Sequence, residues 1–301
     1  VTMRIGARGS DLAQFQARWV QDRLQLAGLE STLIVIKTLG DRVQDKPLHE
    51  LGAQGVFTRE IENELIERKI DIAVHSFKDM AIVQPKSLAI AAITGREDPA
   101  DVLVIKPNSY SQYSDHLMVK QDAVVGTSAV RRKEQLLALR PDLRIIDLRG
   151  NVPTRIQKLR DGNYDAIMLA SAGINRLQLD LSGLSVQRLD PLMFIPSPGQ
   201  GSLAIEMRID HPQFEFVHNV LNDDNAATAT KLEREILAKL GGGCSLPLGA
   251  YARSSGKKWQ IRAFFGGAVS GSKWAEVEGE FPSMLPGRLF GKLGINSESV
   301  R

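Results

Sequence analysis

Short apolar runs alternate with amphipathic helical patterns in this sequence, and this alternation restricts the fold more than any other feature. Four apolar runs near the start have the length of β-strands: 3–7, 32–39, 71–76 and 88–93. Two segments between them repeat apolar residues at helical spacing: 12–28 and 58–69. Strands that alternate with helices predict βαβ units and a mostly parallel sheet.

The same alternation begins again after a short interval. Strands are predicted at 101–105, 123–126, 144–148 and 165–170, with helices at 129–140 and 152–160. One further strand, 202–208, follows this second set. We expect it to return to the first sheet, which gives two crossing connections and a hinged, two-lobed body.

The last third of the chain has a different pattern of predicted elements. A helix at 225–240 leads into a glycine-rich segment, and the alternating runs 259–265 and 274–281 predict antiparallel strands. These elements indicate a small α+β domain. The predicted domains are an α/β domain 1, an arginine-rich α/β domain 2, and an α+β domain 3 with the cysteine loop: 1–96 with 197–216, 97–196, and 217–301.

Composition excludes several classes of protein. The net charge is only +3, and aromatic residues make up 6% of the chain without interleaving with the basic stretch, so we expect no nucleic-acid partner. No apolar run reaches the length of a membrane span, so we expect no membrane partner. A single cysteine and scattered histidines predict neither a disulfide nor a metal site. We expect a cytoplasmic monomer.

Arginines gather in one part of the sequence. Residues 126–176 contain eight Arg and two Lys against five Asp and Glu. Five of these arginines follow predicted strands or enter the first turn of the next helix: Arg131, Arg132, Arg149, Arg155 and Arg176. Helix N-termini and the carboxyl ends of parallel strands are favourable places for anions, and arginine binds carboxylates bidentately. The cluster therefore predicts an anion site, with surface salt bridges to Glu134, Asp142 and Asp147 as the alternative.

Two further residues have functional interpretations with equally ordinary alternatives. Asp79 follows the predicted strand 71–76 and could stabilise a developing cation or pass a proton to a leaving amine, but it could also be a turn aspartate paired with Lys78. Cys244 follows three glycines, which leave its thiol open to a large group, although a free cysteine is usually a packed small hydrophobe. The glycine-containing segment 42–58 is either a mobile lid or an ordinary loop.

Nine segments, taken together and in order, resemble the hydroxymethylbilane synthase (porphobilinogen deaminase) family from residue 4 to about residue 253. They include RIGARGSDLAQFQA, DIAVHSFKDM, VGTSAVRR, LRGNVPTRIQKL, PGQGSLAIEMR and LEREILAKLGGGCSLPLGAYA. The resemblance implies two lobes of the periplasmic-binding-protein type (type II) and a small α+β C-terminal domain. A non-catalytic bilobal binder of anionic small molecules, or a degenerate homologue, is the alternative.

The resemblance also implies a reaction. Members of the family condense four porphobilinogen molecules head to tail with release of ammonia, and hydrolysis then yields the linear tetrapyrrole 1-hydroxymethylbilane for porphyrin and haem biosynthesis. The chain of pyrroles grows on a dipyrromethane cofactor held through a thioether. By this match Cys244 is the covalent anchor and Asp79 is the catalytic residue.

The remaining site residues are carried over from the same motifs. Residues implied at the cofactor, besides Cys244, are Ser10, Lys78, Asp79, Thr127, Ser128, Arg131, Arg132 and Arg155. Residues implied at the substrate are Arg8, Gln16, Arg149, Arg155 and Arg176. The sequence differs from the family pattern at Gln54, which replaces a lysine, at Ala129, which replaces a serine, and at Ala81, where a proline is usual, and its C-terminal domain is divergent. We expect these differences to change affinity or rate rather than to abolish activity.

Overall fold

The computed structural model describes residues 2–38, 58–112, 116–242, 246–267 and 271–294. The chain divides into two compact units. Unit 1 comprises residues 1–97 and 199–244, and unit 2 comprises residues 98–198 and 245–301. The predicted three-domain division stays a prediction; in the observed grouping the helix at 224–239 belongs to unit 1, and the C-terminal sheet belongs to unit 2.

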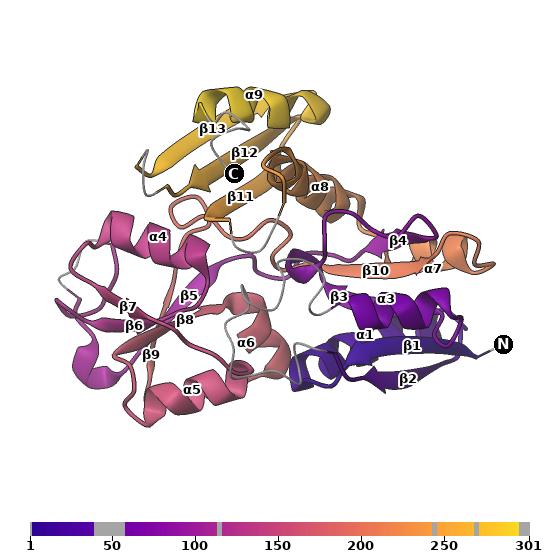
Figure 1. Cartoon of the computed structure of the whole chain (residues 1–301), viewed down its shortest axis with the longest axis horizontal. Coiled ribbons are helices and arrows are strands. Elements are labelled where there is room, and N and C mark those ends of the chain that lie inside the picture. The colour runs from indigo at the N-terminus through magenta and orange to yellow at the C-terminus, as the bar shows by residue number, and fades with distance from the viewer. Residues whose placement is uncertain (1, 39–57, 113–115, 243–245, 268–270, 295–301) are drawn as a thin grey trace. The chain divides into compact units, whose positions relative to one another are not determined.

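Unit 1 contains a five-stranded sheet in the order β2-β1-β3-β10-β4 (Figure 1). Its strands are β1 (Met3–Arg8), β2 (Ser31–Ile36), β3 (Ile72–Ser76), β4 (Leu88–Ile93) and β10 (Leu203–Arg208). Strand β10 pairs antiparallel with both β3 and β4, whereas β1, β2 and β3 are parallel. The expected return of 202–208 to the first sheet is therefore confirmed.

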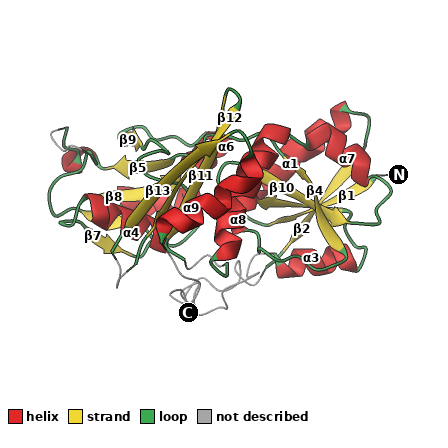
Figure 2. Cartoon of the chain, turned by 90° about the horizontal axis from the view of Figure 1, so that it is seen from above, coloured by secondary structure: helices red, strands yellow, loops and turns green. Residues whose placement is uncertain are grey.

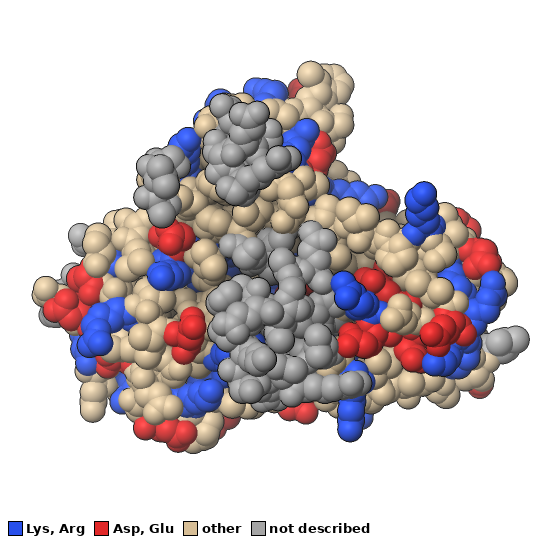
Figure 3. Space-filling model, in the orientation of Figure 1, with Lys and Arg blue, Asp and Glu red and all other residues tan. Residues whose placement is uncertain are grey.

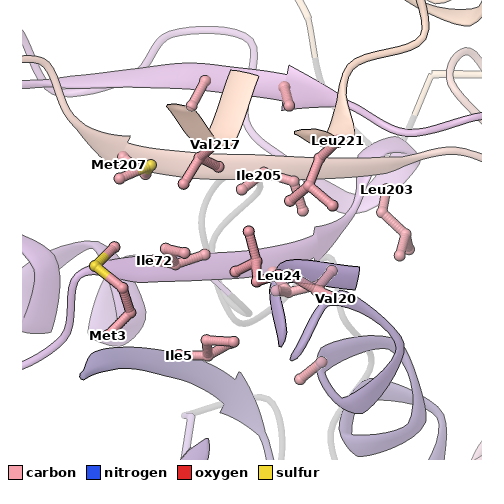
Figure 4. Packing of buried hydrophobic residues seen from close by; sticks show 14 of the residues in the cluster. Met3, Ile5, Val20, Leu24, Ile72, Leu203, Ile205, Met207, Val217 and Leu221 are labelled. Atoms are coloured by element: carbon pink, nitrogen blue, oxygen red, sulfur yellow. The ribbon is translucent and has the colours of Figure 1, made fainter. Parts of the chain in front are cut away.

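Helices cover both faces of this sheet because its strands bury side chains on both sides. The helices of unit 1 are α1 (Asp11–Leu26), α3 (Arg59–Ile66), α7 (Phe214–Leu221) and α8 (Asp224–Lys239). On one face, Ile5 and Ile72 pack with Val20 and Leu24 of α1 and with Val217 of α7 (Figure 4). On the other face, apolar residues of α3 pack against a separate cluster: Ile61 and Leu65 with Ile70, Ala73 and Leu88.

Unit 2 contains a second five-stranded sheet, in the order β7-β6-β8-β5-β9. Its strands are β5 (Asp101–Ile105), β6 (Val124–Gly126), β7 (Arg144–Ile146), β8 (Ala166–Ala170) and β9 (Ser185–Arg188). Its helices are α4 (Val130–Leu139), α5 (Val152–Arg160) and α6 (Ser171–Leu177). Successive residues of β5 enter different clusters, because Leu103 and Ile105 pack with Leu136 of α4, whereas Val102 and Val104 pack with Ile156 of α5.

The two sheets share one topology. Each consists of parallel strands interrupted by a single antiparallel strand next to the edge, β10 in unit 1 and β5 in unit 2. In both units the antiparallel strand directly follows a point at which the chain passes from one unit to the other. Strand β5 is the first strand of its sheet in the sequence, and β10 is the last strand of its sheet. Its amino end therefore lies at the same edge as the carboxyl ends of the parallel strands.

The C-terminal part forms a three-stranded antiparallel sheet, β11 (Leu248–Ser255), β12 (Lys258–Phe265) and β13 (Lys273–Gly279). Helix α9 (Leu285–Leu293) packs along β13 (Figure 2). The antiparallel pair predicted at 259–265 and 274–281 is confirmed. Gly249 of β11 lies so close to the 195–196 segment that an added Cβ would stand 2.6 Å from the Ile195 carbonyl oxygen, which only glycine permits.

Most of these elements were predicted, including the three-residue strands β6 and β7, and several were missed. Strands β4 and β5 and helix α5 occupy the predicted ranges 88–93, 101–105 and 152–160. Helix α6 was not predicted because it follows β8 without a polar break, and its N-cap residue Ala170 makes no side-chain capping bond. The elements β9, β11, α7 and α9 were also missed.

Replacing Ile205 by alanine tests the role of β10 in the core of unit 1. Ile205 is fully buried in the cluster that joins β10 to α1 and α7, so we expect Ile205→Ala to lower the free energy of unfolding by about 2–5 kcal/mol. Urea denaturation followed by circular dichroism measures the change. Ile209→Ala, just beyond the strand and 65% exposed, is the control and should change stability by less than about 0.5 kcal/mol. Equal effects of the two variants would contradict the packing described.

Candidate functional site

In unit 1, chemically active side chains gather at the edge where β1 and β3 end. Arg8 is the last residue of β1, and Lys78 and Asp79 belong to the 3-10 turn η2 (Phe77–Asp79) that directly follows β3. The amino end of β10 joins this edge, because Leu203 pairs with Ser76. The Asp79 side chain is exposed, and the half-buried Lys78 donates a hydrogen bond from Nζ to Oε1 of Gln200 at 3.3 Å.

Two other predicted site residues, Gln16 and Ser10, stabilise this edge of the sheet in unit 1. Gln16 is buried in α1, and its Nε2 donates to the Ser76 hydroxyl oxygen at 3.0 Å. Ser10 is the N-cap of α1 and accepts a hydrogen bond from the Ala13 main-chain N–H at 3.4 Å. Gln16 thus holds the end of β3, and Ser10 begins the helix that follows β1.

A buried ion pair fixes the glycine-rich segment before β10. The Arg96 guanidinium binds both carboxylate oxygens of Glu233, at 2.6 and 3.1 Å, and donates from Nε to the Gln200 carbonyl oxygen at 2.9 Å. Glu233 in α8 is fully buried and also accepts from the Gly199 main-chain N–H at 2.7 Å. These contacts hold Gln200, the partner of Lys78, from two sides. The sequence analysis did not single out Gln200, Arg96 or Glu233.

In unit 2, the corresponding edge is formed by the carboxyl ends of β6, β7 and β8 and by the amino end of β5, where Asp101 pairs with Ala170. Thr127 and Ser128 follow β6 and precede α4. The Thr127 hydroxyl accepts from the Ala129 main-chain N–H at 3.2 Å, and the Ser128 hydroxyl donates to the Leu148 carbonyl oxygen at 3.1 Å. Ala129, the N-cap residue of α4, makes no side-chain capping bond.

Arg131 and Arg132 bind a buried carboxylate at this edge. Arg131 Nη1 lies 2.6 Å from Asp101 Oδ2, and Arg132 Nη2 lies 2.7 Å from Asp101 Oδ1. Arg131 also donates to the Ile195 carbonyl oxygen at 2.8 Å, and Arg132 to the Met168 carbonyl oxygen at 3.1 Å. We call these three charged residues the Asp101 triad. The sequence analysis proposed other carboxylates as salt-bridge partners, and Asp101 was not among them.

The triad explains why two arginines stand in the first turn of α4. Burial raises the pKa of the Asp101 carboxyl, but the charges and hydrogen bonds of Arg131 and Arg132 outweigh this effect and hold its pKa well below the usual range. The unfavourable interaction of each cation with the helix N-terminus is worth only about 0.3–1 kcal/mol. The attraction between each guanidinium and the Asp101 carboxylate at hydrogen-bond distance is larger than this cost. Two cations and one anion leave the triad with one net positive charge.

The other predicted arginines of unit 2 occupy different kinds of position. Arg149 follows β7 and is half-buried, and its carbonyl oxygen accepts from Lys158 Nζ at 3.1 Å. Arg155 lies in the first half of α5, which Asn151 caps, and donates from Nε to the Gly150 carbonyl oxygen at 2.7 Å. Arg176 was expected just beyond a strand end, but it lies in the last turn of α6 because that helix begins directly after β8.

Several predicted features lie outside the described residues. These are Cys244, which the family resemblance predicts as the cofactor anchor, the substituted position Gln54, and all of the segment 42–58 except Thr58. Of the glycines before Cys244, Gly241 and Gly242 are described and have positive φ angles of 84° and 69°. This left-handed backbone after α8 favours glycine, which accounts for the first two glycines of the GGGC segment.

The described residues hold neither a candidate metal site nor a helix that could span a membrane. In Figure 3, Lys and Arg side chains are interspersed with Asp and Glu over the described surface of the visible face. Among the described residues, no group of three or more His, Cys, Asp or Glu side chains is placed to hold a metal ion. Within the same ranges, no helix has the length and apolar character needed to span a membrane.

Comparison with known proteins identifies a family for both parts of the chain. Residues 3–215 match the porphobilinogen deaminase, dipyromethane cofactor binding domain, and residues 227–280 match the porphobilinogen deaminase C-terminal domain. A solved structure of an ancestral cationic amino acid solute binding protein aligns with a TM-score of 0.43 at 13% identity, over 79% of this chain and 91% of that one. The arrangement of the two five-stranded sheets is established by their own strand order, independently of this likeness.

Relatives that match over most of the chain agree with the family match. A probable porphobilinogen deaminase of Methanocella arvoryzae is 46% identical over 259 residues, which cover 86% of this chain and 82% of that protein. A probable porphobilinogen deaminase of Methanococcoides burtonii is 42% identical over 93% of this chain and 88% of that protein. The porphobilinogen deaminase of Campylobacter concisus is 42% identical over 88% of this chain and 84% of that protein.

Removing the carboxylate of the Asp101 triad should destabilise unit 2. Asp101→Asn leaves two buried guanidiniums without their shared counter-charge, so we expect the free energy of unfolding to fall by about 3–5 kcal/mol at neutral pH. Chemical denaturation followed by circular dichroism measures the loss. Asp147→Asn, at an exposed aspartate of the same unit, is the matched control and should stay within about 0.5 kcal/mol of the unsubstituted protein.

The stability difference between the unsubstituted protein and Asp101→Asn should depend on pH in a direction that follows from the lowered pKa of Asp101. Because the folded-state pKa of Asp101 is below the value of about 3.9 for a free aspartate, its stabilisation is fully present above about pH 4 and is lost as the pH falls further. The stability difference between the unsubstituted protein and Asp101→Asn should therefore be constant above about pH 4 and narrow progressively as the pH falls below about 4. A difference that stays constant or widens would contradict an ionised Asp101.

Proposed function

We propose roles for individual residues from the premise that this chain belongs to the porphobilinogen deaminase family. The protein is a hydroxymethylbilane synthase, a transferase of porphyrin biosynthesis that uses a dipyrromethane cofactor. Family membership disfavours a non-catalytic binder of anionic small molecules. The proposals concern which side chains carry the chemistry and which bind the anionic groups.

The substrate determines what the side chains must accomplish. In each condensation, the bond between the aminomethyl carbon and nitrogen of porphobilinogen breaks, and the nitrogen leaves as ammonia after taking up a proton. The carbon that remains is electron-deficient and forms a bond to the free α carbon of the growing pyrrole chain, which then loses its proton. The protein must therefore stabilise a positive charge and move protons, and it must hold many carboxylates.

Asp79 is the proposed catalytic residue. Its carboxyl group is exposed on the turn after β3, so a substrate can approach it, and a carboxylate fixed there stabilises a positive charge developing on the substrate. The same group can transfer a proton to or from the reacting nitrogen and carbon. Lys78 beside it is held by Gln200 and supplies a positive charge for a substrate or cofactor carboxylate.

The described residues suit a bound dipyrromethane because this group is a small polyanion. Each of its pyrrole rings bears an acetate and a propionate side chain. In unit 2, arginines and helix N-termini gather at one edge, where Thr127 and Ser128 precede α4 and Arg149 and Arg155 flank the start of α5. When bound, the cofactor supplies the free pyrrole carbon to which substrate is joined. Ser10, Lys78, Thr127, Ser128 and Arg155 are proposed to hold its carboxylates, and Cys244 to anchor it.

For Arg131 and Arg132 the proposed role is to bind a cofactor carboxylate while Asp101 orients them. Each guanidinium has five N–H donors, and the buried Asp101 engages only part of this set. Asp101 therefore orients both side chains, and the net positive charge of the triad favours a cofactor carboxylate at the start of α4. Arg8, Gln16, Arg149, Arg155 and Arg176 are proposed to act on the substrate, with Gln16 acting through its bond to Ser76.

Location and assembly belong to the same proposal. We propose that the protein acts in the cytoplasm as a monomer on porphobilinogen as its small-molecule partner, with no nucleic-acid or membrane partner. Analytical ultracentrifugation of the purified chain tests the assembly state, since a dimer at micromolar concentration would contradict a monomer.

The intact mass of the purified protein tests covalent attachment. The protein should be heavier than its sequence mass by two pyrrole units, because a thioether to Cys244 survives denaturation. Cys244 is the sole cysteine, so Cys244→Ser removes every thiol without further changes and should return the mass to that of the sequence. An unchanged excess in Cys244→Ser would exclude Cys244 as the anchor.

Replacing Asp79 by asparagine tests the catalytic assignment. Asp79→Asn keeps the size of the side chain but removes its charge and its ability to transfer a proton, so we expect kcat to fall by about 10²–10⁴ while the cofactor stays attached. Formation of 1-hydroxymethylbilane is measured together with the intact mass. Asp22→Asn, at an exposed aspartate of α1, is the control and should retain normal turnover. Normal turnover in Asp79→Asn would remove Asp79 from the mechanism.

A further inference from the structure

We infer that Arg234 is a positioning residue that holds the turn carrying Asp79 in its catalytic conformation. The inference rests on the proposed catalytic role of Asp79. Arg234 was not predicted as a site residue, because it lies in the middle of α8, far from Asp79 in the sequence. It donates hydrogen bonds to main-chain carbonyl oxygens on both sides of Asp79.

The contacts of Arg234 enclose the turn. Its Nη1 donates to the carbonyl oxygens of Phe77 and Met80, each at 3.1 Å, and its Nη2 donates to the Ala81 carbonyl oxygen at 2.7 Å. The guanidinium carbon also lies 4.4 Å from the centre of the Phe77 ring, within the range of a cation–π interaction. One planar group thus contacts the residues before and after Asp79.

The rest of unit 1 holds Arg234 and the turn rigidly against each other. Arg234 is 8% exposed on the buried side of α8, next to Glu233, which binds Arg96. The Phe77 ring is buried with Met80 and with Ala226 and Ala227 of α8. The Phe77 main-chain N–H donates to the Ser202 carbonyl oxygen at 3.1 Å. The turn therefore has few ways to shift without losing a contact.

The consequence for catalysis follows from the exposure of Asp79. An exposed side chain has its position determined mainly by the backbone that carries it, because it lacks close packing of its own. A fixed, charged group acts on a transition state more strongly than one that must reorganise, and a displacement of about 1 Å can cost about 10²-fold in rate. Arg234 supplies this fixation through the backbone and does not touch the reacting atoms.

Arg208 offers a matched control for a purely structural arginine. It is also buried in unit 1, and its Nη1 donates to two main-chain carbonyl oxygens, those of Leu65 at 2.8 Å and Ile70 at 3.0 Å. Arg208 ends β10 and pairs with Leu88, so it lies at the edge of the sheet opposite to Asp79. Losing its contacts should affect stability but not the catalytic turn.

The test compares Arg234→Lys with Arg208→Lys. Lysine keeps the charge but lacks the planar fork, so Arg234→Lys should lower kcat by about 10- to 100-fold and change KM by less than about twofold. Its intact mass should still include the cofactor, and hydrogen exchange of the 77–81 amides should accelerate. Arg208→Lys should show a comparable fall in Tm with kcat unchanged. An equal fall in kcat in both variants, or unchanged exchange at 77–81, would overturn the inference.

A double substitution separates this inference from the proposed function. In an Asp79→Glu background, where the carboxyl group is already displaced, Arg234→Lys should cost much less than it does alone, because both changes disturb the same group. Fully additive losses would overturn the positioning role. If Asp79→Asn is itself fully active, the proposed function has failed; if Asp79→Asn is inactive and Arg234→Lys has normal kcat, only this inference has failed.

A second variant keeps the test decisive if Arg234→Lys does not fold. Phe77→Leu removes the ring beneath the guanidinium and leaves its three hydrogen-bond acceptors in the main chain. We expect a smaller fall in kcat, about 3- to 10-fold, with faster exchange of the 77–81 amides. Normal kcat and normal exchange in Phe77→Leu would overturn the inference.

Discussion

The buried Asp101 triad is the interaction on which the organisation of unit 2 depends. Asp101 starts β5 and is fully buried, a position that a lone carboxylate could not occupy in its charged form. Arg131 and Arg132 compensate the buried negative charge of Asp101, and by binding it they attach the first turn of α4 to β5. The same geometry places a net positive charge at the start of α4, where we propose that a cofactor carboxylate binds.

The shared topology of the two sheets explains why the predicted site residues gather at one edge of each sheet. In each sheet one antiparallel strand brings its amino end to the carboxyl ends of the parallel strands, so residues distant in sequence meet there. In unit 2 this strand contributes Asp101. In unit 1 it follows the segment that contains Gln200, the partner of Lys78. Helix α8 completes unit 1 by binding this segment through Glu233 and the Asp79 turn through Arg234.

The site residues differ in how far local sequence could identify them. Asp79, Thr127 and Arg149 follow strands whose apolar pattern is plain, so their position at a sheet edge was predictable. Arg131 and Arg132 were predicted in the first turn of a helix as part of an anion site, but their partner was not predicted, because Asp101 is an ordinary strand residue by local pattern. Gln16 remains a predicted substrate residue, and the motif did not indicate that it is buried in α1 and donates a hydrogen bond to Ser76.

The sequence by itself determined most of the strands and helices of the two α/β sheets, the return of 202–208 to the first sheet and, through its motifs, the family and its reaction. These properties depend on local periodicity and on short runs of residues, which are readable along one chain. Tertiary structure alone decided that Asp101 binds the two arginines, that Glu233 binds Arg96, and that Arg234 holds the turn of Asp79. Such partnerships depend on contacts between residues far apart in sequence, and no local pattern encodes which carbonyl or carboxylate a buried guanidinium will meet.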